Sequence, residues 1–339
     1  MMFSVVILTK NSLNVVNNLV DALLSQNFKY NFEIIFMDNN SKDGTLKYLE
    51  NVKKSAQNFE VRIVHVPEGE FSHSRTRMKA ANLAKGKFIV FFTDDVVPIG
   101  KDFLEKLTQP VREGKVAASY GVFQIGGKLY DPIDAYIHNN WYHEYEEISE
   151  PISTYCWNKL SPLMRRKLSN FDNCASCINK EILLKIKLPD VPYGEDMTFA
   201  KRLILNNYRV ALVKDAKFYH WHKVKFGYIL KRMCIDQDLS IREFDLYYVS
   251  HLLGVVKNIL IRIIHRTYIG LFKIKAPIWK KIYWIFYNIK ILIADFLGKY
   301  IGTLDEERTK GFLSPIKKKL LKIKHDIINE IYSKSLLRY

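Results

Sequence analysis

Residues 88–95 read Phe-Ile-Val-Phe-Phe-Thr-Asp-Asp, an apolar run that ends in two adjacent carboxylates. The β-branched and aromatic side chains of residues 88–92 predict a buried β-strand, with Asp94 and Asp95 just beyond its carboxyl end. Two neighbouring carboxylates at the exit of a buried strand repel each other unless a cation or a basic group joins them. This stretch therefore favours a site for a hard divalent metal such as Mg²⁺ or Mn²⁺, and a solvated acidic turn is the alternative.

The sequence upstream of this stretch alternates between strand and helix patterns. Apolar, β-branched runs are followed by polar turns and then by amphipathic segments. The predicted strands are residues 4–8, 33–37, 61–66 and 88–92, and the predicted helices are residues 15–24, 46–53 and 75–84. Such alternation indicates an α/β fold with a mostly parallel sheet flanked by helices, and a ligand crevice at the carboxyl ends of the strands.

Polar and basic side chains follow the other predicted strands. Asp38 comes directly after the second strand and could accept hydrogen bonds from a base or from ribose hydroxyls, although a plain turn has the same composition. Arg75 and Arg77 open a predicted helix, where guanidinium groups and the helix N-terminus favour a phosphate group. Surface arginines are the alternative for either residue.

Two short motifs lie farther along the chain. Residues 194–196, Gly-Glu-Asp, open another predicted helix, so Asp196 is available as a general base; acidic residues are also favourable at a helix N-terminus for electrostatic reasons alone. Residues 220–222, His-Trp-His, place His220 and His222 on the same side of an extended segment. Either histidine could complete a metal site, and two structural histidines are the alternative.

The positive charge is concentrated at the end of the chain. The formal net charge is +17, and residues 251–339 carry eighteen Lys or Arg against six Asp or Glu. In that region Arg262, Arg266, Lys273 and Lys280 are spaced to share one helical stripe, with a break expected at Pro277. Basic side chains beside aromatic ones predict an anionic membrane surface as a partner. The alternative is a helix that packs its apolar face on the rest of the protein.

The remaining features of the sequence indicate the cellular compartment of the protein. The first nine residues have no basic stretch and no small-residue cleavage site, so they predict a first strand rather than a signal peptide. The most apolar region, residues 255–301, is interrupted by Lys or Arg every few positions, so no spanning helix is expected. Cys174 and Cys177 have no second ligand pair for zinc, and we expect two ordinary buried thiols in a cytoplasmic protein.

The ordered set of motifs resembles the inverting family-2 glycosyltransferases of the GT-A fold. The residues that carry the resemblance are 5–11, 38–45, 75–95, 194–196 and 220–222. Within the family, residues 70–77, Glu-Phe-Ser-His-Ser-Arg-Thr-Arg, together with residues 92–95 and the His-x-His motif, are most similar to bacterial rhamnosyltransferases. This resemblance implies dTDP-L-rhamnose as the donor, and a UDP-sugar is the alternative.

The resemblance implies a role for each motif. The nucleotide-sugar would be bound by Thr9, Asn11, Asp38, Arg75, Arg77 and Asp94. Asp95 would be the main carboxylate on a divalent cation, Mg²⁺ or Mn²⁺, with His222 or His220 as a further ligand, and Asp196 would be the catalytic base. The chain departs from the family pattern at Thr93, where Asp-x-Asp is usual, and at Met78, where an Asn commonly follows the Arg.

The resemblance also implies a domain plan and a reaction. Residues 1–225 would be the GT-A catalytic domain, with the nucleotide-sugar in residues 1–100 and the acceptor in residues 101–225. Residues 226–339 would be a basic, amphipathic helical extension. The reaction would transfer a sugar, with inversion, to a hydroxyl of a cell-surface glycan or a lipid-linked acceptor, at the inner face of the cell membrane.

Three other classes of protein remain as alternatives. A basic nucleic-acid-binding protein would explain the charge but not the ordered acidic motifs, so we expect no nucleic acid partner. A nucleotidyltransferase would usually carry a glycine-rich phosphate loop after the first strand, and residues 9–13 contain no glycine. A degenerate transferase that binds a nucleotide-sugar without turnover is the third.

Overall fold

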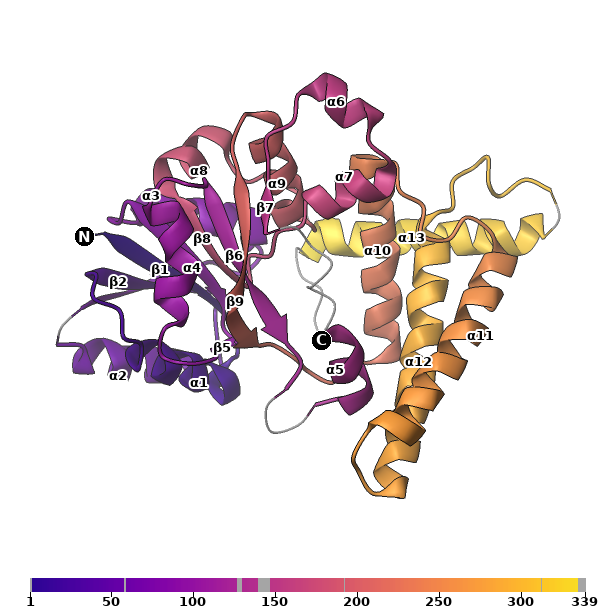
Figure 1. Ribbon diagram of the computed structural model, residues 1–339, viewed down its shortest axis with the longest axis horizontal. Coiled ribbons are helices and arrows are strands. Elements are labelled where there is room, and N and C mark those ends of the chain that lie inside the picture. Colours follow the sequence, from indigo (N-terminus) through magenta and orange to yellow (C-terminus); the bar gives the residue numbers. More distant parts are fainter. Residues whose placement is uncertain are drawn as a thin grey trace.

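The computed structural model describes residues 2–57, 59–126, 130–139, 147–191, 193–311 and 313–334. These residues form a mixed β-sheet flanked by helices, followed by a group of C-terminal helices (Figure 1). The strands are β1 (Phe3–Thr9), β2 (Phe32–Asp38), β3 (Glu60–His65), β4 (Phe88–Thr93), β5 (Val97–Pro98), β6 (Ala118–Gln124), β7 (Ile148–Ser149), β8 (Ala175–Asn179) and β9 (Val210–Tyr219). The predicted α/β class is confirmed.

The helices of the sheet domain connect these strands. In chain order they are α1 (Leu13–Leu24), α2 (Thr45–Ser55), α3 (His73–Leu83), α4 (Phe103–Arg112), α5 (Pro132–His138), α6 (Thr154–Lys159), α7 (Pro162–Leu168), α8 (Lys180–Ile186) and α9 (Glu195–Leu205). Local signals explain several helix starts. The Ser72 side chain accepts a hydrogen bond from the Arg75 N–H at the start of α3, and Asn179 caps α8 in the same way.

The strand order is β3-β2-β1-β4-β8-β6-β9-β5, and β7 also pairs with β9. The first four strands in this order are parallel to one another, as the strand–helix alternation predicted. β8 runs antiparallel between β4 and β6, while β6 and β9 are parallel. The register places Thr9 beside Asp38, so the carboxyl ends of β1 and β2 lie at the same edge of the sheet.

The core consists of two apolar layers, one on each face of the sheet. Side chains alternate along β1, so that Phe3, Val5 and Ile7 enter one layer while Val6 and Leu8 enter the other. The first layer is covered by α1, α2 and α4, and the second by α3, α8 and α9. Because both faces of the central strands are covered, these strands are apolar throughout rather than alternately polar.

Every described element after Tyr219 is helical, which confirms the predicted C-terminal extension. Its helices are α10 (Phe226–Phe244), α11 (Leu252–Tyr268), α12 (Ile278–Gly302) and α13 (Ser314–Lys334). Figure 1 shows them on one side of the sheet domain, with α11 farther from the sheet than α10 and α12 and with α13 lying across these three helices. Among the described helices, none combines the length and the apolar character needed to cross a lipid bilayer.

β9 is one strand although the polar pair Lys214-Asp215 interrupts its apolar sequence, because pairing with β6 continues across this interruption with a shift in register. One local prediction is wrong. The basic stripe predicted along residues 262–280 does not form. α11 ends at Tyr268, a π-helical turn spans Ile269–Lys273, and Arg266 turns inward to donate to Asp134.

Candidate functional site

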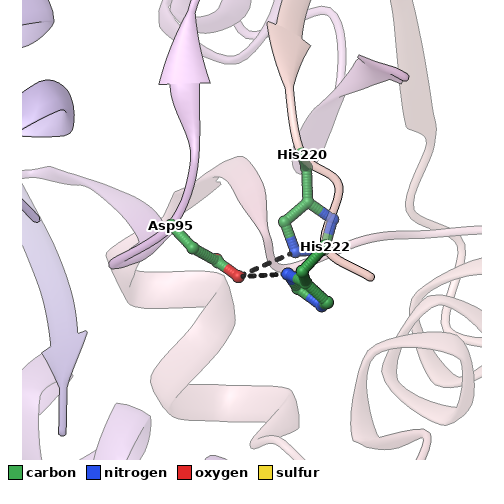
Figure 2. A group of neighbouring side chains, drawn as sticks. All are labelled: Asp95, His220 and His222. Atoms are coloured by element: carbon green, nitrogen blue, oxygen red, sulfur yellow. Dashed lines mark ion pairs between the residues drawn. The ribbon is translucent and has the colours of Figure 1, made fainter. Parts of the chain in front are cut away.

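The metal-ligand candidates come together at the ends of β4 and β9. β5 begins two residues after Asp95 and pairs antiparallel with the last residues of β9, which sets Val97 beside Tyr219. As a result, the Asp95 Oδ2 atom lies 3.3 Å from His220 Nε2 and 3.3 Å from His222 Nδ1 (Figure 2). The predicted meeting of these three side chains is thus present in the structure, on two segments that are more than 120 residues apart in the sequence.

The electrostatics of this group suit a cation. Burial opposes ionisation of Asp95, but the neighbouring His220 and His222 lower its pKa below the usual range. Burial lowers the pKa of His222 to about 4, with a further contribution from His220, so this ring is neutral and keeps a lone pair. The second carboxylate oxygen, Asp95 Oδ1, is buried and makes no hydrogen bond within the described residues. These three residues are a carboxylate-imidazole set that could hold a divalent metal ion.

Asp94 points to a different neighbour. Its Oδ2 atom accepts a hydrogen bond from the backbone N–H of Lys10, at the end of β1, with a distance of 3.3 Å. Burial, together with the charge of Asp95, raises the pKa of Asp94 to about 7. Asp94 is therefore placed between the metal-ligand candidates and the β1–β2 edge rather than with the histidines.

The β1–β2 edge holds the three residues predicted for the nucleoside. The Thr9 hydroxyl donates to Asp38 Oδ1 over 3.0 Å, and the fully buried Asp38 also accepts from the backbone and hydroxyl of Ser41. Asn11 adopts a left-handed backbone with φ 49°, and its side chain accepts from the Lys42 N–H. The predicted turn thus holds Asp38 in place, and its contact with a nucleoside stays a prediction.

A cavity of about 600 Å³ opens beside the metal-ligand candidates. His220, His222, Thr93 and Asp196 all line it. Asp196 is in the first turn of α9, whose start is set by Gly194 in a left-handed conformation with φ 71°. Burial raises the pKa of Asp196 above the usual range for aspartate, and the nearby carboxylates Glu195 and Asp172 raise it further. Asp196 thus lines the cavity, and its role as the catalytic base stays a prediction.

The two arginines of α3 have different surroundings. Arg77 is 2% exposed, and its Nη1 atom forms an ion pair of 2.7 Å with Glu195, the residue before Asp196. Arg75 is largely exposed, pairs with Asp190 over 3.5 Å and lines a second, smaller cavity of about 400 Å³. Arg77 is part of the main cavity, whereas Arg75 does not line it within the described residues.

Several cavity residues carry no clear signal in the sequence. Asp172 lies in the turn before β8, where its charge acts on both Asp196 and His220. Asn170, Asp172 and Asn173, polar residues just before a strand, were the only pattern that could have pointed to it. The far wall comes from the C-terminal helices, whose charged and amide side chains there are Arg232, Asp236, Arg266, Asn288 and Asp295. These polar residues interrupt amphipathic helices singly, so their spacing does not distinguish them from surface residues.

The two thiols predicted to be ordinary are free in the structure. Cys177 is fully buried in the core layer under α4, and burial raises its pKa. Cys174 is partly buried, and burial raises its pKa as well. Neither thiol is among the residues grouped with Asp95.

Comparison with known proteins agrees with the geometry. Residues 4–171 match the model of Glycosyl transferase family 2. The uncharacterized protein y4gI of Sinorhizobium fredii is 29% identical over 130 residues, which are 38% of this chain and only 13% of that protein. The relative is thus matched over a small part of its own length.

Two solved structures cover nearly the whole chain. The mannosyltransferase PcManGT from Pyrobaculum calidifontis, solved with GDP-Man and Mn²⁺, has a TM-score of 0.51 at 16% identity and covers 99% of this chain and 84% of its own. S. aureus TarS 1–349, solved with UDP-GlcNAc, has a TM-score of 0.47 at 18% identity and covers 98% of this chain and 90% of its own. The mannosyltransferase likeness confirms the GT-A-like arrangement. Residues 4–171, just under half of the chain, form a glycosyl transferase family 2 domain.

Proposed function

We propose that this glycosyltransferase moves a sugar from a nucleoside diphosphate to an acceptor hydroxyl, with inversion, and that it needs a divalent cation. The observation that carries the proposal is the group Asp95, His220 and His222, which borders the cavity that contains Asp196. Asp38 lies at the same edge of the sheet. The nucleoside of a nucleotide-sugar thus has a candidate partner in Asp38, and its diphosphate has one in a cation held by Asp95 and the histidines. One carboxylate and two imidazoles favour Mn²⁺ over Mg²⁺, because Mg²⁺ prefers oxygen ligands.

The chemistry of the step follows from this placement. The ionised Asp196 carboxylate takes the proton of the acceptor hydroxyl, and the acceptor oxygen bonds to the anomeric carbon from the side opposite the diphosphate. The bond from that carbon to the diphosphate oxygen breaks, and the electron pair leaves with the nucleoside diphosphate. A cation on Asp95 and the histidines would supply the positive charge that stabilises this leaving group. Arg77 positions the base by holding Glu195.

The donor we propose is dTDP-L-rhamnose, and a UDP-sugar is the second candidate. Support comes from the sequence motifs around residues 70–77 and 92–95. In the solved relatives the bound donors are UDP-GlcNAc and GDP-Man, so both belong in any donor panel. For the acceptor we propose a hydroxyl of a cell-surface glycan or a lipid-linked molecule, which the enzyme meets at the anionic inner face of the cell membrane through residues 251–339.

The test is release of nucleoside diphosphate from each donor, with Mn²⁺, with Mg²⁺ and with a chelator. We expect release only with a divalent cation. We also expect a loss of 100-fold or more, on the order of a removed general base, for Asp196→Asn. Asp95→Asn should abolish the stabilisation by Mn²⁺ in thermal unfolding. Asp21→Asn, on the exposed side of α1, is the matched control.

Each part of the proposal can fail separately. Near-normal turnover of Asp196→Asn removes it as the base. Full turnover in the chelator, or Mn²⁺ stabilisation that survives Asp95→Asn, removes the metal site. Mn²⁺ affinity is then compared between His220→Ala and His222→Ala. The variant that loses more affinity has lost the histidine that contributes more to binding the ion.

A further inference from the structure

We propose that one face of α11, together with the adjoining first turns of α12, binds an anionic lipid bilayer. Half of the large apolar side chains that are exposed in the described part of the chain lie between residues 252 and 286. The most exposed are Leu253 at 79%, Ile264 at 71%, Phe272 at 72% and Phe286 at 68%. A concentration of this kind on one continuous stretch of the chain marks an interaction surface. We call this surface, on residues 252–286, the outer face.

The spacing of these side chains shows that they share one side of each helix. On α11 the exposed apolar positions are 253, 256, 260, 261, 264 and 268, which recur every three or four residues. The opposite side of α11 is occupied, because Val255 is buried and Ile259 and Ile263 pack with it against α12. The outer face is therefore additional to the packing face, and internal packing does not account for it.

The charges around the outer face identify the occupant. Residues 246–294 contain no Asp or Glu and eight Lys or Arg. Lys280 lies 5.3 Å from the ring centre of Trp279, a pairing of cation and aromatic ring suited to the lipid headgroup region. A second copy of this chain would bring like charges together across the contact. An anionic bilayer satisfies the apolar and the basic side chains at the same time.

The outer face is narrower than the basic region as a whole. The apolar side of α13 packs inward, where Ile327 and Ile331 are buried against Cys234 and Ile301. Lys324 on α13 donates to the backbone carbonyls of Gly302 and Leu304. α13 thus follows the packing alternative, although it is also basic. The described part of the membrane contact is confined to α11, the turn after it and the start of α12.

The position of the outer face has a consequence for the acceptor. The same two helices contribute Arg266, Tyr287 and Asn288 to the wall of the main cavity. In Figure 1 the α11–α12 pair extends beyond the sheet domain, so the pair can contact a bilayer while its inner side borders the cavity. This step rests on the proposed function. It favours a lipid-linked acceptor over a soluble glycan, because binding would bring the cavity close to the membrane.

Vesicle co-sedimentation of the full chain tests the proposal. One set of vesicles contains phosphatidylcholine alone. The other contains phosphatidylcholine with about 30% phosphatidylglycerol, which gives its surface a negative charge. We expect binding to the anionic vesicles only. Ile264→Ser with Phe272→Ser should weaken it at least tenfold, and Lys273→Gln with Lys275→Gln roughly fivefold per lysine. The controls are Leu163→Ser, exposed on α7, and Lys53→Gln with Lys54→Gln on α2.

Two results would overturn the proposal. One is vesicle binding that is unchanged in the Ile264 and Phe272 variant. The other is a dimer, seen by light scattering, that the same variant converts to a monomer, since a second copy would then occupy the outer face. Donor-dependent release of nucleoside diphosphate is measured in parallel without vesicles. It should persist in all of these variants, so failure of the membrane proposal and failure of the transferase proposal remain distinguishable.

Discussion

At the scale of single residues, Asp196 is buried, although its proposed role as a general base requires an ionised carboxylate. Its pKa is raised by burial and by its acidic neighbours, whereas a general base must be ionised to act. The folded chain therefore holds a proton on Asp196 at pH values where an unfolded chain has released it. The consequence is a conflict between stability and activity that pH should reveal.

We expect Asp196→Asn to raise the melting temperature at neutral pH. A folded-state pKa above the unfolded value means that the protonated group stabilises the fold at low pH, and that this stability is lost as pH rises through the folded pKa. The gain in the variant should therefore be absent near pH 4 and grow toward neutral pH. Thermal unfolding without metal or donor measures it across this pH range. A constant difference at every pH would contradict the raised pKa.

The Arg77–Glu195 pair allows a second residue-level prediction. Glu195→Gln leaves the Arg77 guanidinium buried without its counter-charge, which should cost about 3–5 kcal/mol in the free energy of unfolding. Asp190→Asn breaks the exposed pair with Arg75, and this change should stay below about 1 kcal/mol. Urea unfolding measures both variants. Equal effects would show that the buried pair contributes no more to stability than the exposed one.

At the scale of elements, the contact of α12 with α10 forms one wall of the cavity. Two glycines one turn apart make this contact close. A Cβ atom at Gly298 would lie 2.4 Å from the Leu230 carbonyl oxygen, and one at Gly302 would lie 2.4 Å from the Cys234 carbonyl oxygen. Both obstacles are backbone atoms of α10, so only movement of a helix could make room for an added methyl group.

We therefore expect Gly298→Ala and Gly302→Ala each to destabilise the fold by about 1–3 kcal/mol, the usual cost of an overpacked contact. Gly227→Ala is the control, because that glycine is in α10, the other helix of the pair, and an added Cβ would meet no atom within 4 Å. The control should be neutral or slightly stabilising, since alanine is the better helix former. Denaturant unfolding compares the three variants. Equal stability of all three would mean that α10 and α12 can separate freely.

At the scale of the whole molecule, the C-terminal helices are joined to the sheet domain by buried polar contacts. Asn288 on α12 donates to Asp131 at the start of α5 over 2.6 Å, and Arg266 on α11 donates to both Asp134 and Asn288. Desolvation raises the pKa of Asp131 to about 6. These contacts and the shared cavity make the two parts one structural unit.

We accordingly predict a single cooperative unfolding transition. Far-UV circular dichroism reports mainly on the long helices. The fluorescence of Trp157, in a variant whose other four tryptophans are replaced by phenylalanine, reports on the packing of α6 and α9 with α10. Both should give the same midpoint, and Mn²⁺ should raise both by the same amount, because ligand binding stabilises the whole cooperative unit. Two midpoints, with Mn²⁺ moving only one of them, would show that residues 226–339 unfold on their own.

The sequence by itself determined the secondary structure of the sheet domain and the class of its fold. Strand patterns such as residues 88–92 and the turn after residue 37 are local, since they depend on side-chain period and on turn chemistry within a few residues. The same local patterns marked Asp38, Asp95, Asp196 and the two histidines. The change from mixed elements to helices near residue 225 was also visible in the sequence.

Only the tertiary structure decided which of these residues meet. Asp95 reaches the histidines because β5 pairs with β9, and the two-residue β5 carries no pattern of its own. Tertiary packing likewise gave Arg77 an internal partner, split the basic region into an outer face and a packed helix, and added α10–α12 to the cavity. Contacts between distant segments depend on chain closure and on the fit of whole elements, and no local period of side chains encodes them.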